Sequence, residues 1–328
     1  MVIVRSPFRI PLAGGGTDLP AFFNKIDGFL LSTTIDKYIY LTINKTFKEN
    51  QIIIKYSKIE NVNHYSKIKH SLFKSVFENY YPHLKGVEIN CISDLPFGTG
   101  MGSSGSLLVA IIAGLEKFIG NNTSKRKIAE MACKIEINFL KLPVGKQDQF
   151  SAAYGNLRSY KFTKKNTIVR KVNIPKANLN SFFNSMLLYY TGITRSASNI
   201  LKNEVINLKK TNSKNVKNLI KVREFAYIFE KLLINNKVDE IGNIMRQHWE
   251  LKKIRNPLVT NKAIDNFYNK ALKNGAIGGK VLGAGGGGFV LLISKNTKHL
   301  KDKLKNSTFR EVPIKIDIEG VKIINEIY

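Results

Sequence analysis

Cysteine, long apolar runs and negative charge are all scarce in this sequence. The cysteines among its 328 residues are Cys91 and Cys133, and neither belongs to a CxxC pair, so we expect buried free thiols rather than a disulfide framework. The five histidines show no metal-ligand spacing, which argues against a zinc site. No apolar run approaches the roughly 20 residues that cross a bilayer, and the start is too quickly polar for a signal peptide. The sequence therefore predicts a cytoplasmic protein with no membrane partner.

The shortage of acidic residues leaves a large positive charge. Lysine and arginine number 52 against 24 aspartates and glutamates, which gives a formal net charge of +28. A nucleic-acid binder, a general compositional bias rich in Asn and Ile, and attraction of anionic substrates would each account for this charge. The lysines are scattered rather than gathered in a block, so we expect no nucleic-acid partner. The charge alone does not decide among the three explanations.

The pattern of apolar residues indicates an α+β fold with about two domains. Hydrophobic residues make up 43% of the chain, which is ample for a packed core. Strands are expected at Val2–Ile10, Phe29–Ile35, Tyr38–Asn44, Gln51–Tyr56, Val87–Ile92, Met186–Thr191, Ile277–Leu282, Phe289–Ser294 and Ile314–Ile318. Helices are expected at Ser66–Tyr81, Ser103–Phe118, Ser124–Leu140, Met245–Ile254, Asn261–Leu272 and Thr297–Leu304. We place the domains at residues 1–180 and 181–328.

The strongest local signal is a glycine- and serine-rich loop, residues 95–106, which follows a strand and opens a helix. Glycines allow close approach to a ligand, and a helix start offers free N–H groups and a positive dipole end, a combination that binds phosphate. Residues 100–105 also fit the dinucleotide pattern GxGxxG, but a second helix follows the first where a strand is required. They fit GxxxxG as well, but Ser106 stands where a P-loop has lysine. A plain turn with Ser103 or Ser104 as N-cap is the structural alternative.

Two further glycine-rich stretches lie on either side of this loop in the chain. Residues 14–20 follow a strand, and Thr17 or Asp18 either caps a helix or presents a carboxylate and backbone amides to the hydroxyls of a ligand. Arg9 would point a permanent cation into the same cleft. Residues 283–288 stand between two expected strands and contain more glycines than a hairpin needs, which indicates close approach to another backbone or to a ligand.

These three stretches, in this order, resemble the motifs of the GHMP kinases, a family that includes galactokinase, homoserine kinase, mevalonate kinase and phosphomevalonate kinase. The resemblance runs from Ile3 to roughly Ile293. It implies a two-domain GHMP kinase fold, with a ribosomal protein S5 domain 2-like ATP-binding domain at 1–180 and a ferredoxin-like domain at 181–328. It also implies phosphoryl transfer from ATP, with Mg²⁺, to a hydroxyl group of a small molecule.

The resemblance assigns roles to individual residues. Those implied to bind ATP are Gly98, Thr99, Gly100, Met101, Gly102, Ser103, Ser104, Gly105 and Ser106. Met101 and Gly105 replace a leucine and an alanine of the family pattern. Ser104 matches the serine that coordinates Mg²⁺, and Glu136 is the best match for the glutamate that completes the metal site. Asp148 would take the proton of the acceptor, with Arg9 beside it to hold it ionised and to stabilise the transferring charge. Some homoserine kinases rely on positioning without such a base.

The acceptor implied by the resemblance is a sugar phosphate. Residues 14–20 look like those of D-glycero-D-manno-heptose 7-phosphate kinases and L-fucokinase-like sugar kinases, and residues 189–197 and 248–253 look typical of the heptose-phosphate group. The implied reaction phosphorylates the anomeric C1 hydroxyl and gives a 1,7-bisphosphate for nucleotide-activated heptose and bacterial surface polysaccharide. The residues implied to bind the substrate are Gly14, Gly15, Gly16, Thr17, Asp18, Arg195, Gly285 and Gly286.

An acceptor that already carries phosphate needs an additional cationic pocket. Arg195 is the candidate, with Lys37 and Lys146 as weaker ones, whereas His248 and Trp249 are expected to pack on a helix. An L-fucokinase- or galactokinase-like sugar kinase is the nearer alternative. A regulator that keeps the fold without turnover and a nucleic-acid-binding protein are the distant alternatives. The sequence also leaves open a homodimer.

Overall fold

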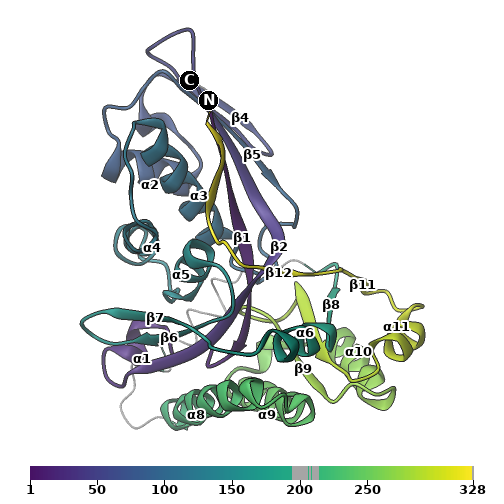
Figure 1. Ribbon diagram of the computed structural model, residues 1–328. Helices are drawn as coiled ribbons and strands as arrows, with labels where there is room; N and C mark the ends of the chain where they lie inside the picture. The colour runs from purple at the N-terminus through teal and green to yellow at the C-terminus, as the bar shows by residue number, and fades with distance from the viewer. Residues whose placement is uncertain (194–205, 207, 209–213, 327–328) are drawn as a thin grey trace.

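The computed structural model describes residues 1–193, 206, 208 and 214–326, and this part of the chain forms two sheets with helices packed against them (Figure 1). The larger sheet has the strand order β13-β1-β2-β5-β3-β4, with β6 and β12 added at β2 and β7 added at β6. Its strands are β1 (Val2–Ala13), β2 (Gly28–Lys45), β3 (Ile52–Lys55), β4 (Ile59–Val62), β5 (Val87–Ser93), β6 (Arg158–Phe162), β7 (Thr167–Lys171), β12 (Ile316–Asp317) and β13 (Lys322–Glu326). The pair of β3 and β5 is parallel, and the other pairs are antiparallel.

The strand β2 is the central strand of this sheet. It joins the two expected strands Phe29–Ile35 and Tyr38–Asn44 into one, because the chain stays extended through Asp36 and Lys37, where the Asp36 N–H donates to the Lys315 carbonyl at 2.9 Å. Side chains at alternate positions such as Ile39, Leu41 and Ile43 are fully buried under the helices, as the two-residue period of a strand requires.

Helices from the first half of the chain cover one face of the larger sheet (Figure 1). They are α2 (Ser71–Tyr80), α3 (Ser103–Phe118), α4 (Lys125–Cys133), η2 (Lys134–Phe139) and α5 (Gln147–Tyr154), with the short turn η1 (Tyr65–Lys67) before α2; the short helix α1 (Pro20–Phe23) lies beside β6 and β7 (Figure 1). The helix α3 packs against β1 and β2, and the run Leu107–Ala113 is buried throughout, so α3 forms the centre of this layer. Gly114 allows the close contact, since a Cβ there would lie 2.6 Å from Ile43 Cδ1.

The expected helix Ser124–Leu140 consists of two parts. The α-helix α4 begins after Ser124, whose side chain accepts a hydrogen bond from the Lys127 N–H, an ordinary N-cap. From Lys134 the chain widens into the π-helical turn η2, which carries Glu136. π-helical turns of this kind are frequent at functional sites.

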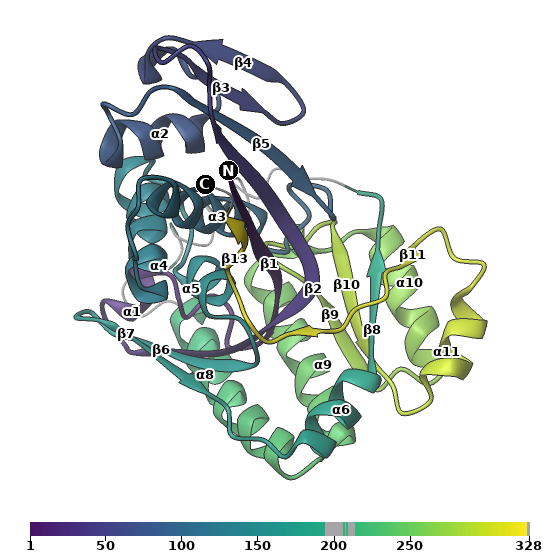
Figure 2. The ribbon, with the colours of Figure 1, turned by 45° about the horizontal axis from the view of Figure 1, so that its top comes forward.

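The smaller sheet is formed by the second half of the chain. Its order is β11-β8-β10-β9, with β8 (Met186–Tyr190), β9 (Gly278–Val281), β10 (Phe289–Ile293) and β11 (Arg310–Glu311). The helices of this half are α6 (Lys176–Asn184), α8 (Lys214–Ile234), α9 (Val238–Arg255), η3 (Pro257–Val259), α10 (Lys262–Lys273) and α11 (Thr297–Leu304). Figure 2 shows α10 and α11 beyond β8, and α8 and α9 on the side towards the larger sheet. Gly242 and Gly278 bring α9 directly onto β9, because a Cβ on Gly278 would collide with the Gly242 carbonyl.

The end of the chain departs from what the sequence suggests. The expected strand Ile314–Ile318 is reduced to the two residues of β12, and the unexpected β13 pairs with β1 at the edge of the larger sheet. The helix α6 was also not expected. The α+β fold class is confirmed, whereas the domain boundary near residue 180, which falls within α6, stays a prediction.

The sequence predicts that both cysteines are buried free thiols. Cys133 is buried, Cys91 is partly buried, and both are free thiols. Burial raises the pKa of Cys91 to about 11 and that of Cys133 well above its ordinary value, so neither thiol is a ready nucleophile. Within the described residues no helix combines the length and the apolar character needed to span a membrane.

Candidate active site

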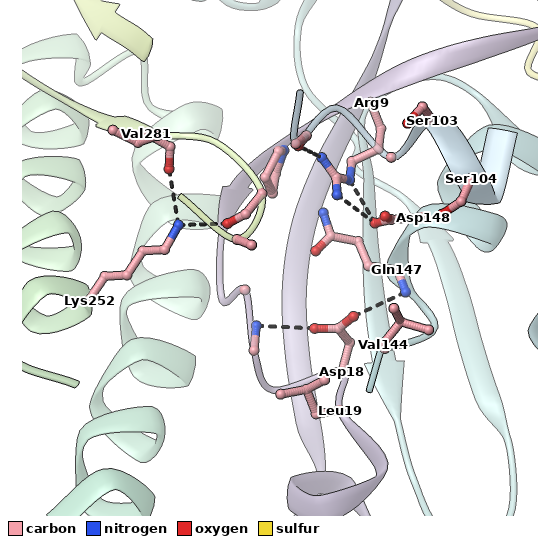
Figure 3. A pocket seen from close by; sticks show the side chains of 18 of the residues that line it. Arg9, Asp18, Leu19, Ser103, Ser104, Val144, Gln147, Asp148, Lys252 and Val281 are labelled. Carbon is pink, nitrogen blue, oxygen red and sulfur yellow. Dashed lines mark hydrogen bonds and ion pairs between the residues drawn. The ribbon is translucent and has the colours of Figure 1, made fainter. Parts of the chain in front are cut away.

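A cavity of about 380 Å³ brings together motifs that are far apart in the sequence (Figure 3). One side, here called the β1–α3–α5 wall, is formed by β1, the loop before α3 and the residues around the start of α5. The opposite side, the α9–β9 wall, is formed by α9, β9 and the residues just after β9. The predicted site residues that line the cavity are Arg9, Gly15, Gly16, Asp18, Gly98, Gly100, Gly102, Ser103, Ser104 and Asp148.

Arg9 and Asp148 form a close ion pair in the β1–α3–α5 wall. Arg9 Nε donates to Asp148 Oδ1 at 2.8 Å, Nη2 lies 2.7 Å from the same oxygen, and Nη1 donates to the Gly100 carbonyl at 2.7 Å. A register shift of β1 between Pro7 and Arg9 coincides with this site, and the Arg9 N–H turns to the Met101 carbonyl. Asp148 keeps 29% of its side chain exposed, so it can accept a proton from a hydroxyl group in the cavity.

The loop before α3 turns through three left-handed glycines. Gly98, Gly100 and Gly102 have φ angles of +77°, +79° and +80°, which residues with a Cβ rarely adopt. Space is also limited at Gly102, where a Cβ would lie 3.2 Å from Arg9 Cγ and from Asp148 Cγ. Gly102 leads into the first turn of the 16-residue helix α3, so free N–H groups and a positive dipole end lie at the cavity. This arrangement fits a phosphate group.

Four loop residues predicted to bind ATP are not among those that line the cavity. Thr99 and Met101 are buried, and the Ser106 hydroxyl donates to a carbonyl of β1 at 2.8 Å. Gly105 lies inside α3 against α5, where a Cβ would approach Asp148 Cβ to 2.7 Å. The glycine therefore lets the two helices come close together, and the assignment of these four residues to ATP stays a prediction.

Ser104 and Glu136 have the chemistry of a Mg²⁺ site. Glu136 is 1% exposed; its Oε2 accepts a hydrogen bond from Gln149 Nε2, and its Oε1 is buried without a hydrogen bond. Burial raises the pKa of Glu136 to about 7, an effect that the Ser104 hydroxyl opposes and the Asp148 charge increases. Magnesium prefers oxygen ligands, and a cation would satisfy the orphaned carboxylate oxygen. The residues therefore fit the predicted metal site, which remains a prediction.

Asp18 ties the first glycine-rich stretch to the start of α5. Its Oδ1 accepts a hydrogen bond from the Gly16 N–H at 3.1 Å and its Oδ2 one from the Gln147 N–H at 3.2 Å. Burial raises the pKa of Asp18 to about 6, and the charge of Asp148 acts in the same direction. Gly145 makes room for the carboxylate, because a Cβ there would collide with it. The pair Gly16 and Asp18 thus lies at the cavity with its backbone fixed.

Other residues predicted to bind the substrate lie away from the cavity lining. Gly14 and Thr17 stand behind it, where Thr17 Oγ1 donates to the Gly14 carbonyl at 2.7 Å. Lys37 and Lys146 are likewise not among the lining residues. Arg195 falls outside the residues that the structure describes. The substrate contacts proposed for these residues stay predictions.

The glycine run after β9 mainly approaches other backbone segments. Cβ atoms on Gly285 and Gly287 would lie 2.8 Å from Val259 Cβ and 2.5 Å from the Ile193 carbonyl oxygen, and one on Gly288 would collide with the Thr99 carbonyl. The Gly286 N–H donates to the Val259 carbonyl. The cavity is lined instead by the two residues at the start of the run, Gly283 and Ala284. Substrate contacts of Gly285 and Gly286 therefore stay predictions.

Several polar side chains at the cavity were not assigned to it from the sequence. Gln147 lines the cavity with its Nε2 buried and without a hydrogen bond. His248, Lys252 and Arg255 line it from α9, and Lys280 lines it from β9. The first three are spaced i, i+4 and i+7, which puts them on one face of a helix. This spacing of basic residues is the signal that could have revealed them, because a purely packing face would be apolar.

Buried basic residues dominate the α9–β9 wall. His248 and Lys280 are each 3% exposed. Burial lowers the pKa of Lys280 well below its ordinary value, and the charges of Lys252, Arg9 and Arg255 act in the same direction. Burial and the neighbouring cations Lys280, Arg255 and Lys252 lower the pKa of His248 in the same way. Both lowered pKa values favour the uncharged side chains, so the wall is rich in basic residues whose buried members resist protonation.

Comparison with known proteins gives consistent matches over nearly the whole chain. The GHMP kinases N terminal domain matches residues 67–156 and the GHMP kinases C terminal domain matches residues 229–310, together just over half of the chain. A D-glycero-alpha-D-manno-heptose 7-phosphate kinase of Campylobacter jejuni is 28% identical over 308 residues, 90% of this chain and 89% of that protein. A galactokinase of Pyrococcus furiosus is 28% identical over 331 residues, 90% of each chain.

Solved structures share the fold over the full length. A D-glycero-D-manno-heptose 1-phosphate kinase of Bacteroides thetaiotaomicron superposes with a TM-score of 0.81 at 24% identity and covers 100% of both chains. A galactokinase of Lactococcus lactis in complex with galactose superposes with a TM-score of 0.79 at 16% identity, over 98% of this chain and 94% of that one. At these identities the likeness shows the fold, including its two-domain architecture.

Proposed function

The chain belongs to the GHMP kinase family of ATP-dependent phosphotransferases, and on this premise we propose that it phosphorylates the anomeric C1 hydroxyl of D-glycero-D-manno-heptose 7-phosphate. The product would be the 1,7-bisphosphate, a precursor of nucleotide-activated heptose for surface polysaccharide, made in the cytoplasm. The observation that carries the proposal is the Arg9–Asp148 pair beside the start of α3, in a cavity whose opposite wall carries basic side chains. Similarity to the heptose 7-phosphate kinase of Campylobacter jejuni supports this acceptor.

The β1–α3–α5 wall supplies the groups that phosphoryl transfer requires. In the proposed reaction, Asp148 accepts the proton of the sugar hydroxyl as the oxygen bonds to the γ-phosphorus and the bond to the β-phosphate oxygen breaks, with ADP as the leaving group. Arg9 lies next to Asp148 and can stabilise the negative charge on the transferring group. The amides of the loop at 98–104 hold the nucleotide phosphates, and Gln147 is placed to orient the acceptor.

Ser104 and Glu136 would hold Mg²⁺ in this scheme. The hydroxyl and the buried carboxylate are both hard oxygen donors at the base of the phosphate loop. The ion, when bound, neutralises charge on the phosphate oxygens. Glu136 would then serve as its fixed anionic ligand rather than as a proton donor.

A coupled assay of ADP release tests the acceptor directly. Purified protein with Mg·ATP is offered heptose 7-phosphate, L-fucose, galactose, mevalonate and homoserine, and phosphorus NMR locates the new phosphate. We expect kcat/KM for heptose 7-phosphate to exceed that for the other acceptors by at least about 100-fold, with phosphate on C1. Preferred turnover of fucose or galactose would replace the heptose assignment by a free-sugar kinase, and no turnover of any acceptor by folded protein would contradict the proposal.

A further inference from the structure

Two side chains that line the cavity each carry a buried nitrogen atom that has no hydrogen-bond partner in the described part of the chain. They are Gln147, through its Nε2, and His248, through its Nδ1. Gln147 stands at the start of α5, in the β1–α3–α5 wall, and His248 stands on α9, in the opposite wall. A buried polar group without a partner costs free energy, so folded proteins contain few of them. A ligand in the cavity that supplies the missing partners would remove this cost.

The backbone around Gln147 fixes the position of its side chain. Its N–H donates to Asp18 Oδ2 at 3.2 Å, and the next residue, Asp148, is held by Arg9. Gln147 is only 4% exposed, so its side chain has little freedom to turn away from the cavity. In Figure 3 the carboxamide lies between the Arg9–Asp148 pair and Asp18. An uncharged amide donor between two acidic side chains suits the oxygen of a hydroxyl group better than that of an anion, which the carboxylates would repel.

His248 presents an uncharged imidazole from the other wall. The residue is 3% exposed, and burial lowers the pKa of its ring well below the ordinary value. The basic side chains nearby act on this pKa in the same direction. In a neutral imidazole one ring nitrogen donates a hydrogen bond and the other accepts one. A hydroxyl group can answer either role, because it carries one donor and two lone pairs.

We infer that Gln147 and His248 bind two different hydroxyl groups of the acceptor, one from each wall of the cavity. Gln147 is adjacent to Asp148 in the chain, so its partner is the hydroxyl group next to the reacting one. His248 stands on the opposite wall, so its partner lies farther from the reacting hydroxyl group. The inference rests on the proposed function as a sugar kinase, and it adds which hydroxyl groups the site requires and which residues bind them.

The kinetic test pairs each variant with an acceptor that lacks one hydroxyl group. Wild type, Gln147→Met and His248→Phe are assayed with heptose 7-phosphate and with its 2-deoxy analogue. With the full acceptor we expect kcat/KM to fall about 10-fold in each variant, through the loss of one hydrogen bond between uncharged groups. With the 2-deoxy analogue, Gln147→Met should stay within about threefold of wild type, because the partner of the amide is absent. His248→Phe should lose about 10-fold with both acceptors, chiefly through KM.

Gln247 provides a matched control for the loss of an amide. It precedes His248 on α9, is exposed and does not line the cavity, so Gln247→Met should keep wild-type kinetics with both acceptors. His248→Gln restores a hydrogen-bonding group and should recover part of the loss seen in His248→Phe. Equal losses with both acceptors in Gln147→Met, or a raised KM for ATP, would overturn the inference, because the amide would then serve folding or the nucleotide. Wild-type kinetics in His248→Phe would overturn the role of the imidazole.

A binding experiment separates this inference from the choice of heptose 7-phosphate as the acceptor. The Tm of each protein is measured with free heptose, heptose 7-phosphate, L-fucose or galactose in the presence of saturating Mg·ADP. At least one of these sugars should raise the Tm of wild type and Gln247→Met, and raise it clearly less in Gln147→Met and His248→Phe. Such a result without turnover of heptose 7-phosphate would reject that acceptor and support the two contacts. Equal stabilisation of all four proteins, or of none, would overturn the inference, since neither side chain would then bind a sugar hydroxyl group.

Discussion

The two walls of the cavity differ in the charged side chains that line them. In the β1–α3–α5 wall the cation Arg9 is paired with the carboxylate of Asp148. In the α9–β9 wall cations gather beside other cations, and the pKa of Lys280 falls because of burial and that crowding. A cation paired with a carboxylate suits groups that move or stabilise charge during a reaction, whereas a wall lined by basic side chains suits the attraction of an anion. The comparison predicts that mutations in the first wall act on kcat and those in the second on KM.

The largest effect should come from Asp148. Replacing it by asparagine keeps the shape of the side chain but removes the proton acceptor and the charge opposite Arg9. We expect kcat to fall roughly 10²- to 10⁴-fold, while the dissociation constant for Mg·ATP changes by less than about threefold. Rapid-quench turnover and nucleotide titration measure the two quantities separately. A kcat within about threefold of wild type would show that positioning alone drives phosphoryl transfer. The prediction that the first wall acts on kcat and the second on KM would then lose its main support.

The next largest effect should come from Glu136, and we expect it in the free energy of unfolding. The pKa of its carboxyl rises from an ordinary value of 4.5 to about 7 in the folded protein, chiefly through burial. Below about pH 4.5 it is protonated in both states; as the pH rises through 7 the unfolded chain ionises first, so the folded state loses stability. The difference corresponds to about 3 kcal/mol at most. Without Mg²⁺, Glu136→Gln should therefore become more stable than wild type between about pH 5 and pH 8.

Magnesium should reverse the order of stability of wild type and Glu136→Gln. At about pH 8 it should raise the Tm of wild type, because it pairs with the ionised carboxylate, and leave Glu136→Gln nearly unchanged. Asp18, whose pKa is raised to about 6, contributes equally to both proteins and cancels from their difference. Parallel pH profiles of the two proteins, or equal stabilisation by Mg²⁺, would remove Glu136 from the metal site.

The sequence predicts the first wall far better than the second. The motifs around Gly98–Ser104 and Asp148 are local, and the strand-to-helix transition with its glycine-rich loop is visible in the order of residues. Lys252 and Lys280 become neighbours only because α9 packs onto β9 through Gly242 and Gly278, a contact between distant segments. The spacing of His248, Lys252 and Arg255 puts them on one face of a helix, but a basic helix face is usually solvated, so the spacing alone does not place it in a cavity. The strand β13 was missed for the same reason, since its partner β1 lies at the other end of the chain.

Glycine content alone does not separate the two walls either. Gly98, Gly100 and Gly102 line the cavity, whereas Gly287 and Gly288 have no room for a side chain because other backbone segments lie against them. The end of the second run, at Gly288, thus lies directly against the loop before α3. The backbone of Gly288 is held in place from its other side by the residues after β8: its N–H donates to the Ile193 carbonyl at 2.8 Å, and its carbonyl accepts from the Thr191 N–H at 2.9 Å.

The contact between Gly288 and Thr99 can be tested by adding a methyl group at Gly288. At Gly288, with φ at +77°, an alanine Cβ would collide with the Thr99 carbonyl, so Gly288→Ala should push the two loops apart. Gly120 is the control: its φ is +85°, but a Cβ there meets nothing within 4 Å, so Gly120→Ala should cost only the backbone strain, about 1 kcal/mol. In urea unfolding we expect Gly288→Ala to lose about 2 kcal/mol more than this control. It should also weaken both Mg·ATP and acceptor binding, since both walls move. Equal stabilities of the two variants would mean that the loops at Thr99 and Gly288 can move apart without loss of stability. The two walls would then be independent units rather than parts of one site.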